Sequence, residues 1–149
     1  ALSRLIHQRA VTSRQLVERS LARIERYTPE LLCVITATKD RALAQADRLD
    51  AEAKAGKFRG PLHGIPYGAK DLFAVPGYPT TWGSPIYKDQ VLDVTAAVVE
   101  RLDAAGAVLV AKTSLGEFAQ DDTWFGGQTK NPWNTAQGSG GSSAGSGGR

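Results

Sequence analysis

A strand, a helix and a second strand follow one another in the middle of the chain, and this order constrains the fold most. Residues 64–71 predict a short strand that carries a lysine into a turn. A helix capped by Asp93 or Thr95 is predicted to run to about Ala105, and residues 107–111 predict a compact buried strand. Two strands joined by a helix form a right-handed parallel crossover. The sequence therefore predicts an α/β fold.

The first sixty residues are mostly helical in pattern, with one interruption. Thr12 and Gln15 have the spacing of a capping box at the start of an amphipathic helix. Pro29 is expected to end or interrupt that helix. Residues 32–36 predict a short buried strand, and residues 42–55 return to helix-forming residues. These helices are expected to serve packing and not chemistry.

Proline distribution marks the boundary between two parts of the chain. Five of the seven prolines fall between residues 61 and 85, and such a stretch cannot be one regular element because each proline removes a hydrogen-bond donor. We therefore distinguish a helical lead-in, residues 1–60, from residues 61–149, which hold the candidate chemistry.

Composition excludes several classes of protein. With 149 residues, of which 42% are hydrophobic, disorder over the whole chain is excluded. The net charge of +3 comes from scattered basic residues, whereas a nucleic-acid binder clusters them. The apolar runs are much shorter than the ~20 residues that cross a bilayer, and the N-terminus lacks a signal-peptide pattern, so a cytoplasmic location is expected. Cys33 is expected to be a buried structural thiol, and no Cys/His spacing fits a zinc site.

Residues 138–149 form a tract in which ten of twelve residues are Gly or Ser. Composition alone fits a flexible linker or an engineered tail, but dense glycine also suits a backbone that approaches a substrate closely. The tract matches a nucleophile elbow centred on Ser143; that elbow needs a buried strand before it and a histidine after it, and His7 and His63 both precede it. A phosphate-binding loop is excluded because no Gly-Lys-Ser/Thr closes the tract.

A third interpretation joins these serines to Lys70, which ends the first predicted strand. Taken alone, such a lysine is more often solvated or paired with its neighbour, here Asp71. Lysine is a base at neutral pH only where burial or neighbouring charges lower its pKa from about 10.4. A neutral lysine could then accept a proton from a serine hydroxyl, which is how Ser–Lys sites work without histidine.

Four sequence blocks stand in one order along the second part of the chain. They are Gly-Ile-Pro-Tyr-Gly-Ala-Lys-Asp at residues 64–71, Gly-Ala-Val-Leu-Val-Ala-Lys-Thr at 106–113 with Glu-Phe at 117–118, Asn-Pro-Trp-Asn at 131–134 and Gly-Gly-Ser-Ser-Ala-Gly at 140–145. In this order they resemble the amidase signature family. The resemblance implies a mixed β-sheet flanked by helices, with residues 1–149 forming the N-terminal part of a single domain that is incomplete at its C-terminus.

The resemblance also implies a site. The family's general base falls on Lys70, and its bridging serine, which follows a cis peptide bond, falls on Ser142. Ser143 is implied as a hydrogen-bonding support, with Gly140 and Gly141 as supporting residues. The Ser142 Oγ and Lys70 Nζ atoms should then lie about 2.6–3.2 Å apart. No metal and no organic cofactor is implied.

The implied activity is cleavage of a carbon–nitrogen bond in a small-molecule amide through an acyl-enzyme. The family's nucleophile is another serine, in a downstream Asp-x-Gly-Gly-Ser block that also supplies the oxyanion hole; no such block occurs up to Arg149. Two alternatives remain: the A subunit of a tRNA-dependent glutaminyl/asparaginyl amidotransferase, with companion subunits, or a non-catalytic binding or structural piece. The partners are expected to be a second copy of the chain in a homodimer or the companion subunits of an amidotransferase, and no membrane or direct nucleic-acid partner is expected.

Overall fold

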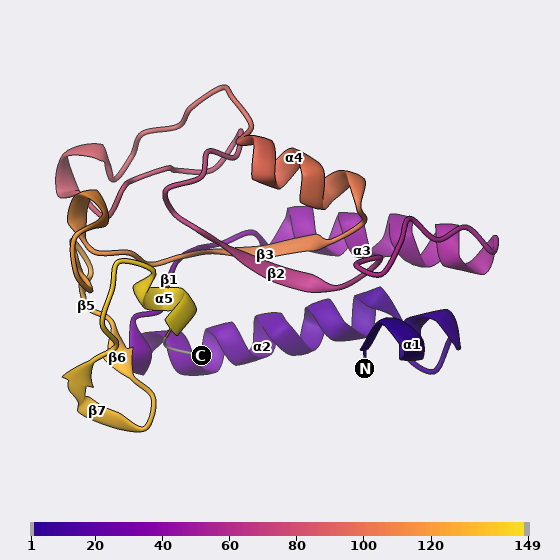
Figure 1. The fold of residues 1–149 in the computed structure, drawn as a ribbon, viewed down its shortest axis with the longest axis horizontal. Coiled ribbons are helices and arrows are strands. Elements are labelled where there is room, and N and C mark those ends of the chain that lie inside the picture. The colour runs from indigo at the N-terminus through magenta and orange to yellow at the C-terminus, as the bar shows by residue number, and fades with distance from the viewer. Residues whose placement is uncertain (1, 148–149) are drawn as a thin grey trace.

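The computed structural model describes residues 2–147 (Figure 1). Its helices are α1 (Leu2–His7), α2 (Ser13–Leu31), α3 (Lys39–Lys54), α4 (Ala97–Ala104) and α5 (Ala144–Gly147), with short 3-10 turns at Pro85–Tyr87 and Glu117–Ala119. Its strands are β1 (Val34–Ala37), β2 (Pro66–Lys70), β3 (Val108–Thr113), β4 (Thr123–Trp124), β5 (Gly127–Gln128), β6 (Lys130–Asn131) and β7 (Asn134–Gly138).

A three-stranded sheet in the order β1-β3-β2 lies at the centre of the fold. β2 runs parallel to β3 and is connected to it through α4, whereas β1 is antiparallel to β3. The predicted parallel arrangement of these two strands and the α/β class with a mixed sheet are therefore confirmed. β3 is buried along its whole length because it has a strand on each side and helices over both faces.

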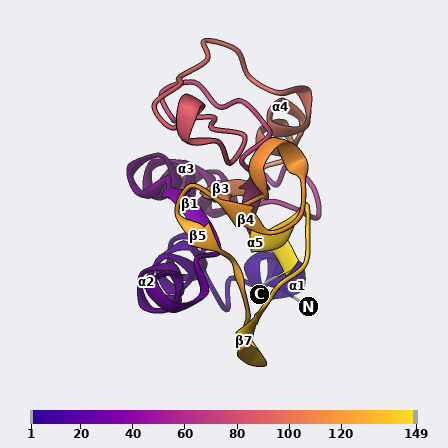
Figure 2. The same ribbon diagram turned by 90° about the vertical axis from the view of Figure 1, so that its left-hand side faces the viewer.

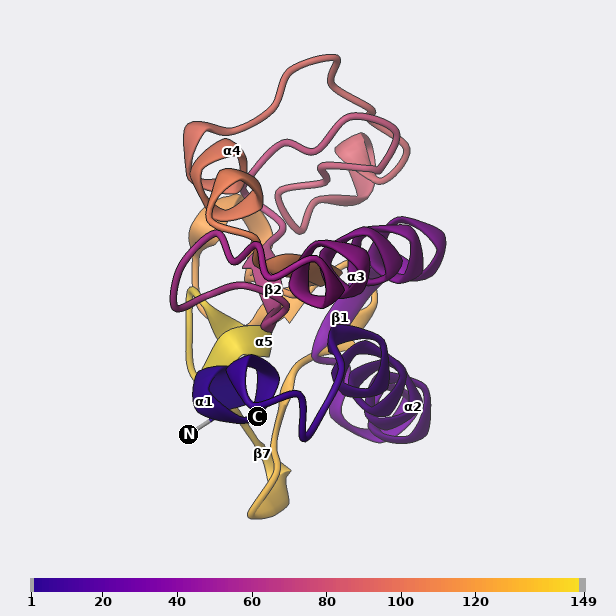
Figure 3. The same cartoon turned by 90° about the vertical axis from the view of Figure 1, so that its right-hand side faces the viewer.

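The two faces of β3 belong to two apolar clusters. Val108 and Val110 pack with Val17 of α2 and with the alanine-rich face of α3. Leu109, which alternates with them and so points the other way, packs with Val99 of α4. Figures 1 and 3 show α2 and α4 on opposite sides of the sheet. The lead-in helices thus supply one half of the packing around the central strand.

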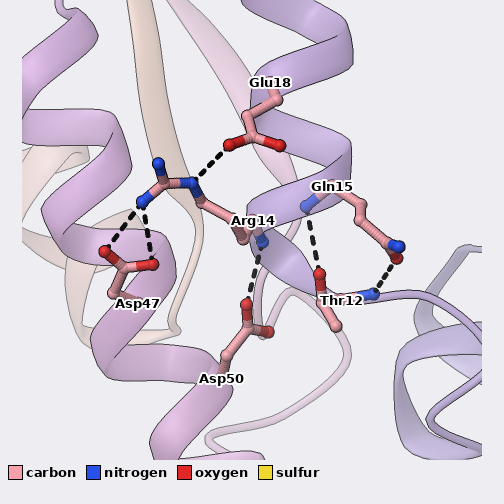
Figure 4. A network of polar contacts seen from close by, with 6 residues as sticks. All are labelled: Thr12, Arg14, Gln15, Glu18, Asp47 and Asp50. Carbon is pink, nitrogen blue, oxygen red and sulfur yellow. Dashed lines mark hydrogen bonds and ion pairs between the residues drawn. The ribbon is translucent and has the colours of Figure 1, made fainter.

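The start of α2 is fixed by the contacts drawn in Figure 4. Thr12 Oγ1 accepts a hydrogen bond from Gln15 N at 3.1 Å, and Gln15 Oε1 accepts one from Thr12 N at 3.0 Å, so the predicted capping box is confirmed. Asp50 of α3 accepts a hydrogen bond from Arg14 N at 3.0 Å, and the Arg14 guanidinium pairs with Asp47. A carboxylate at a helix N-terminus is favourable to the helix dipole, so α3 both packs against α2 and caps it.

The end of α2 differs from the prediction. The helix continues through Pro29, and the bond from Leu32 N to Thr28 O at 2.8 Å closes its last turn. Leu32 has a φ of 52° and caps the helix, so the strand predicted over residues 32–36 begins only at Val34. Cys33, expected to be buried, is half-buried.

Two predicted helix starts also differ from those in the structure. The helix predicted from Asp93 or Thr95 begins at Ala97, because Ala96 has an extended backbone and donates from its N to Ala74 O at 2.9 Å. The helix predicted over residues 42–55 begins earlier, at Lys39, and Thr38 just before it donates from its backbone N to Val110 O at 3.0 Å. In both cases a contact between distant segments lies at the position where the helix starts.

Two small hairpins, β4–β5 and β6–β7, follow β3. The β6–β7 hairpin projects from the fold on the side of α2 (Figures 1 and 2), and the chain then returns so that α5 contacts β2 and β3. None of the helices described is long and apolar enough to cross a membrane.

Candidate active site

Lys70 is the last residue of β2. Ala69 before it packs in the α4 cluster, so the alternation of the strand directs Lys70 to the opposite face, where α5 lies. The Lys70 side chain is half-buried, and burial lowers the pKa of its ammonium group below the ordinary value.

Ser142 lies in the turn between β7 and α5, after a cis peptide bond with Gly141. Lys70 Nζ donates a hydrogen bond to Ser142 Oγ at 2.8 Å, although 72 positions separate the two residues. The distance lies within the range expected for a proton relay. A base and a hydroxyl at this separation can exchange a proton directly.

The segment after Ser142 is docked on the end of β3. Gly145 N donates to Ser114 O at 2.9 Å, and the hydroxyls of Thr113 and Ser146 lie 3.2 Å apart. A Cβ atom at position 145 would collide with Cys33 O and with the backbone of Ser114, so only glycine allows α5 to lie this close. Ser114 in turn shares a hydrogen bond of 2.7 Å with Thr129.

The segment before Ser142 is held by a second contact. Gly140 N donates to the Asp122 carboxylate at 2.9 Å. Gly140 has a φ of 72°, and a Cβ atom at Gly141 would overlap the carbonyl of Asp121. The backbone conformation at position 140 therefore favours glycine, and the lack of space at position 141 requires it.

Ser143 follows Ser142 in the turn that leads to α5. Its side chain is exposed, and no hydrogen bond from its hydroxyl occurs within residues 2–147, whereas its carbonyl accepts from Ser146 N and Gly147 N. The predicted supporting role of its side chain stays a prediction.

Two other interpretations of the Gly/Ser tract do not fit the geometry. The strand before it, β7, is mostly exposed, and the histidines are engaged elsewhere: His7 with Ser3 O and His63 with Leu49 O. The elbow centred on Ser143 is therefore not assembled among the described residues. Residues 139–147 are hydrogen-bonded to the rest of the fold, unlike a linker; residues 148–149 of the tract lie outside the described part.

One alternative paired Lys70 with Asp71, but Asp71 pairs with Lys112 instead. Its Oδ1 lies 2.5 Å from Lys112 Nζ, on the α4 side of the sheet, and both side chains are completely buried. Asp71 Oδ2 accepts from Thr81 N at 2.8 Å, and Lys112 Nζ also donates to Pro79 O at 2.8 Å. Burial lowers the pKa of Lys112, and the Asp71 carboxylate opposes that shift.

Sequence reasoning missed Ser114, Asp122 and Lys112. Lys112 stood inside the second motif block and directly after a predicted buried strand, which is a signal for a buried cation that needs a partner. Ser114 and Asp122 carry no signal of their own, because their partners lie 31 and 18 positions away in the sequence. Within residues 2–147 no group of three or more His, Cys, Asp or Glu side chains could hold a metal ion.

The family model described as Amidase matches residues 15–148. The A subunit of the glutamyl-tRNA(Gln) amidotransferase from Methylococcus capsulatus is 44% identical over 144 residues, which make up 95% of this chain and 30% of that protein. Its counterpart from Halorhodospira halophila is 40% identical over 148 residues, covering 97% of this chain and 30% of that protein.

Solved structures agree with this match. The peptide amidase of Stenotrophomonas maltophilia has a TM-score of 0.88 and 35% identity, covering 97% of this chain and 32% of that one. A protein from a vestigial complex tied to the origins of an s-triazine catabolic enzyme has a TM-score of 0.91 and 34% identity, over 97% of this chain and 33% of that one. The chain thus spans about 30% of the length of the curated relatives it matches. On the family match and on the fold, the chain belongs to the amidase signature family.

Proposed function

We propose that this chain supplies the base and the bridging serine of an amide-bond hydrolase. The observation that carries the proposal is the 2.8 Å hydrogen bond from Lys70 Nζ to Ser142 Oγ. Burial, which lowers the pKa of Lys70, supports it further, because only a neutral lysine can accept a proton. Residues 1–149 would form the N-terminal part of one domain, and the protein would be cytoplasmic.

The chemistry proceeds in two halves. A serine outside these 149 residues attacks the carbonyl carbon of the amide; its proton passes to Ser142 Oγ, and the Ser142 proton passes to Lys70 Nζ. The carbon–nitrogen bond then breaks as a proton returns through the same groups to the leaving amine, which leaves an ester with the attacking serine. Water cleaves that ester by the same relay and releases the carboxylic acid.

A second candidate is the A subunit of a tRNA-dependent amidotransferase, and the sequence comparison favours it. Curated relatives with that description are 39–44% identical to this chain over 90–97% of its length. The same Lys70–Ser142 pair would then release ammonia from glutamine, and the partners would be companion subunits instead of a second copy.

The test is an assay on a full-length protein that contains these residues. Release of ammonia or amine is measured with simple aliphatic and aryl amides and with glutamine, with and without companion subunits, and Lys70→Ala is the matched inactive variant. Turnover of simple amides by the protein alone supports the hydrolase. Turnover of glutamine that needs the companions supports the amidotransferase, and wild-type rates in Lys70→Ala would contradict both.

A reading frame that continues into an Asp-x-Gly-Gly-Ser block also supports catalysis, since that block holds the family's nucleophile. A stop codon directly after Arg149 would favour a non-catalytic binding or structural role.

A further inference from the structure

A buried carboxylate lies beneath the turn that leads to Ser142. The Asp122 side chain is 4% exposed, and within residues 2–147 no lysine or arginine forms an ion pair with it. Its Oδ2 accepts a hydrogen bond from Gly140 N at 2.9 Å, and its Oδ1 accepts one from Gln128 Nε2 at 3.1 Å. Removing a carboxylate from water is costly unless it is hydrogen-bonded. The hydrogen bonds from Gly140 and Gln128 therefore stabilise the buried Asp122 side chain.

The carboxylate also fills the space under this turn. A Cβ atom at Gly138 would overlap Asp122 Oδ2. The backbones are tied together as well, because Thr129 N donates to Asp122 O at 3.0 Å and Ser139 N donates to Thr129 O at 2.9 Å. Asp122 is therefore part of the surface against which the turn is formed.

The contacts of Asp122 and Ser114 lie on either side of Ser142. Gly140, held by Asp122, precedes it by two positions, and Gly145, held by the Ser114 carbonyl, follows it by three. Of these two contacts, only the one from Asp122 is made by a side chain. A hydrogen bond from a backbone N–H to a carboxylate is about twice as strong as one between neutral groups.

We propose that Asp122 is a positioning residue for Ser142, fixing through Gly140 the distance between Ser142 Oγ and Lys70 Nζ. This inference rests on the proposed function, because it concerns the rate of the same proton relay. A displacement of about 1 Å at a reacting group can lower a rate about 100-fold. Loss of this carboxylate should thus slow the chemistry without weakening substrate binding.

The experiment uses the full-length protein and compares Asp122→Ala with the wild type. We expect kcat to fall about 100-fold with KM unchanged. Asp122→Asn keeps an oxygen acceptor for Gly140 N and should retain more of the rate than Asp122→Ala. Asp93→Ala, which removes an exposed aspartate from the loop before α4, is the matched control and should behave as wild type.

Two readouts separate positioning from a general loss of structure. In a Ser142→Ala background, Asp122→Ala should cause little further loss of rate, because both changes act on the same group. Amide hydrogen exchange in a peptide that covers residues 138–147 should become faster in Asp122→Ala and stay unchanged in Asp93→Ala.

The outcomes are distinct. An Asp122→Ala protein with the wild-type kcat, or losses that multiply in the Ser142→Ala background, would overturn the inference while leaving the proposed function intact. If Asp122→Ala does not fold, Asp122→Asn decides: a lower kcat at the wild-type Tm supports the inference, and the wild-type kcat overturns it. A wild type that cleaves no amide would refute the proposed function. The hydrogen-exchange rates of residues 138–147 would then test by themselves whether Asp122 holds the turn in place.

Discussion

Lys70 and Lys112 lie near the ends of neighbouring strands but face opposite sides of the sheet, and their surroundings differ. Lys70 is half-buried and hydrogen-bonded to a neutral hydroxyl, whereas Lys112 is fully buried and paired with Asp71. The alternation of side chains along the predicted strand is enough to predict that Lys70 points to the face opposite Ala69. It could not reveal which lysine pairs with Asp71, because that depends on the loop carrying Thr81, which folds back over the sheet.

Lys112→Met should strongly destabilise the full-length protein. It leaves the Asp71 carboxylate buried without its cation, and breaking a buried ion pair on one side costs about 3–5 kcal/mol. Urea unfolding measures the loss. The double variant Asp71→Asn with Lys112→Met should recover part of it, and a single-variant loss well under about 1 kcal/mol, as for surface pairs, would contradict the burial of this pair.

The pH dependence of activity should report Lys70. Burial lowers its pKa below the ordinary value of 10.5, so the neutral form is present at lower pH than for a free lysine. We expect kcat/KM to rise with pH and to level off below pH 10.5. The unfolded state binds more protons at this site than the folded state, so stability should also rise with pH over that range. A profile still rising at pH 10.5 would contradict the shift.

At the scale of elements, the crossover from β2 through α4 to β3 followed from local sequence patterns, namely two short strand-like segments with a helix pattern between them. The start of α4 and the end of α2 could not be predicted in this way. Ala96 is held by a contact with Ala74, and Leu32 ends α2 in a left-handed conformation that the helix pattern does not indicate. The position of α5 against the sheet could not be predicted from the sequence either, because a helix of four residues is too short to show a periodic pattern.

Gly145→Ala tests that docking. Its Cβ would collide with the backbone of Cys33 and Ser114, so α5 must move and carry Ser142 away from Lys70. We expect a fall in kcat of at least about tenfold in the full-length protein. Gly147→Ala in the same helix is the control, because its Cβ would meet nothing closer than Ser139 O at 3.9 Å. Equal rates for the two variants would show that α5 is not fixed by this contact.

For the molecule as a whole, the described residues bring together two of the three groups of the proposed relay, Lys70 and Ser142. The strand that carries Lys70, β2, lies at the edge of the three-stranded sheet. The β6–β7 hairpin leaves Trp133 at its tip 83% exposed. The chain spans about 30% of the length of its curated relatives. The order of the motif blocks could predict this pair, because Lys70 lies in the first block and Ser142 in the last.

The 149-residue chain by itself should hydrolyse no amide at an appreciable rate. It contains no Asp-x-Gly-Gly-Ser block, and nucleophile and oxyanion hole together normally supply most of the rate acceleration. Incubation of the purified chain with simple aliphatic and aryl amides tests this. Turnover that disappears in Ser143→Ala would instead support the nucleophile elbow.

The measurement that tests the shared relay most directly is a double-mutant cycle on kcat in the full-length protein, with Lys70→Ala, Ser142→Ala and the two combined. Because both groups handle the same proton, each single variant should lose several orders of magnitude, and the double variant should be little slower than either one. Losses that multiply in the double variant would show that Lys70 and Ser142 act independently, and would contradict the relay.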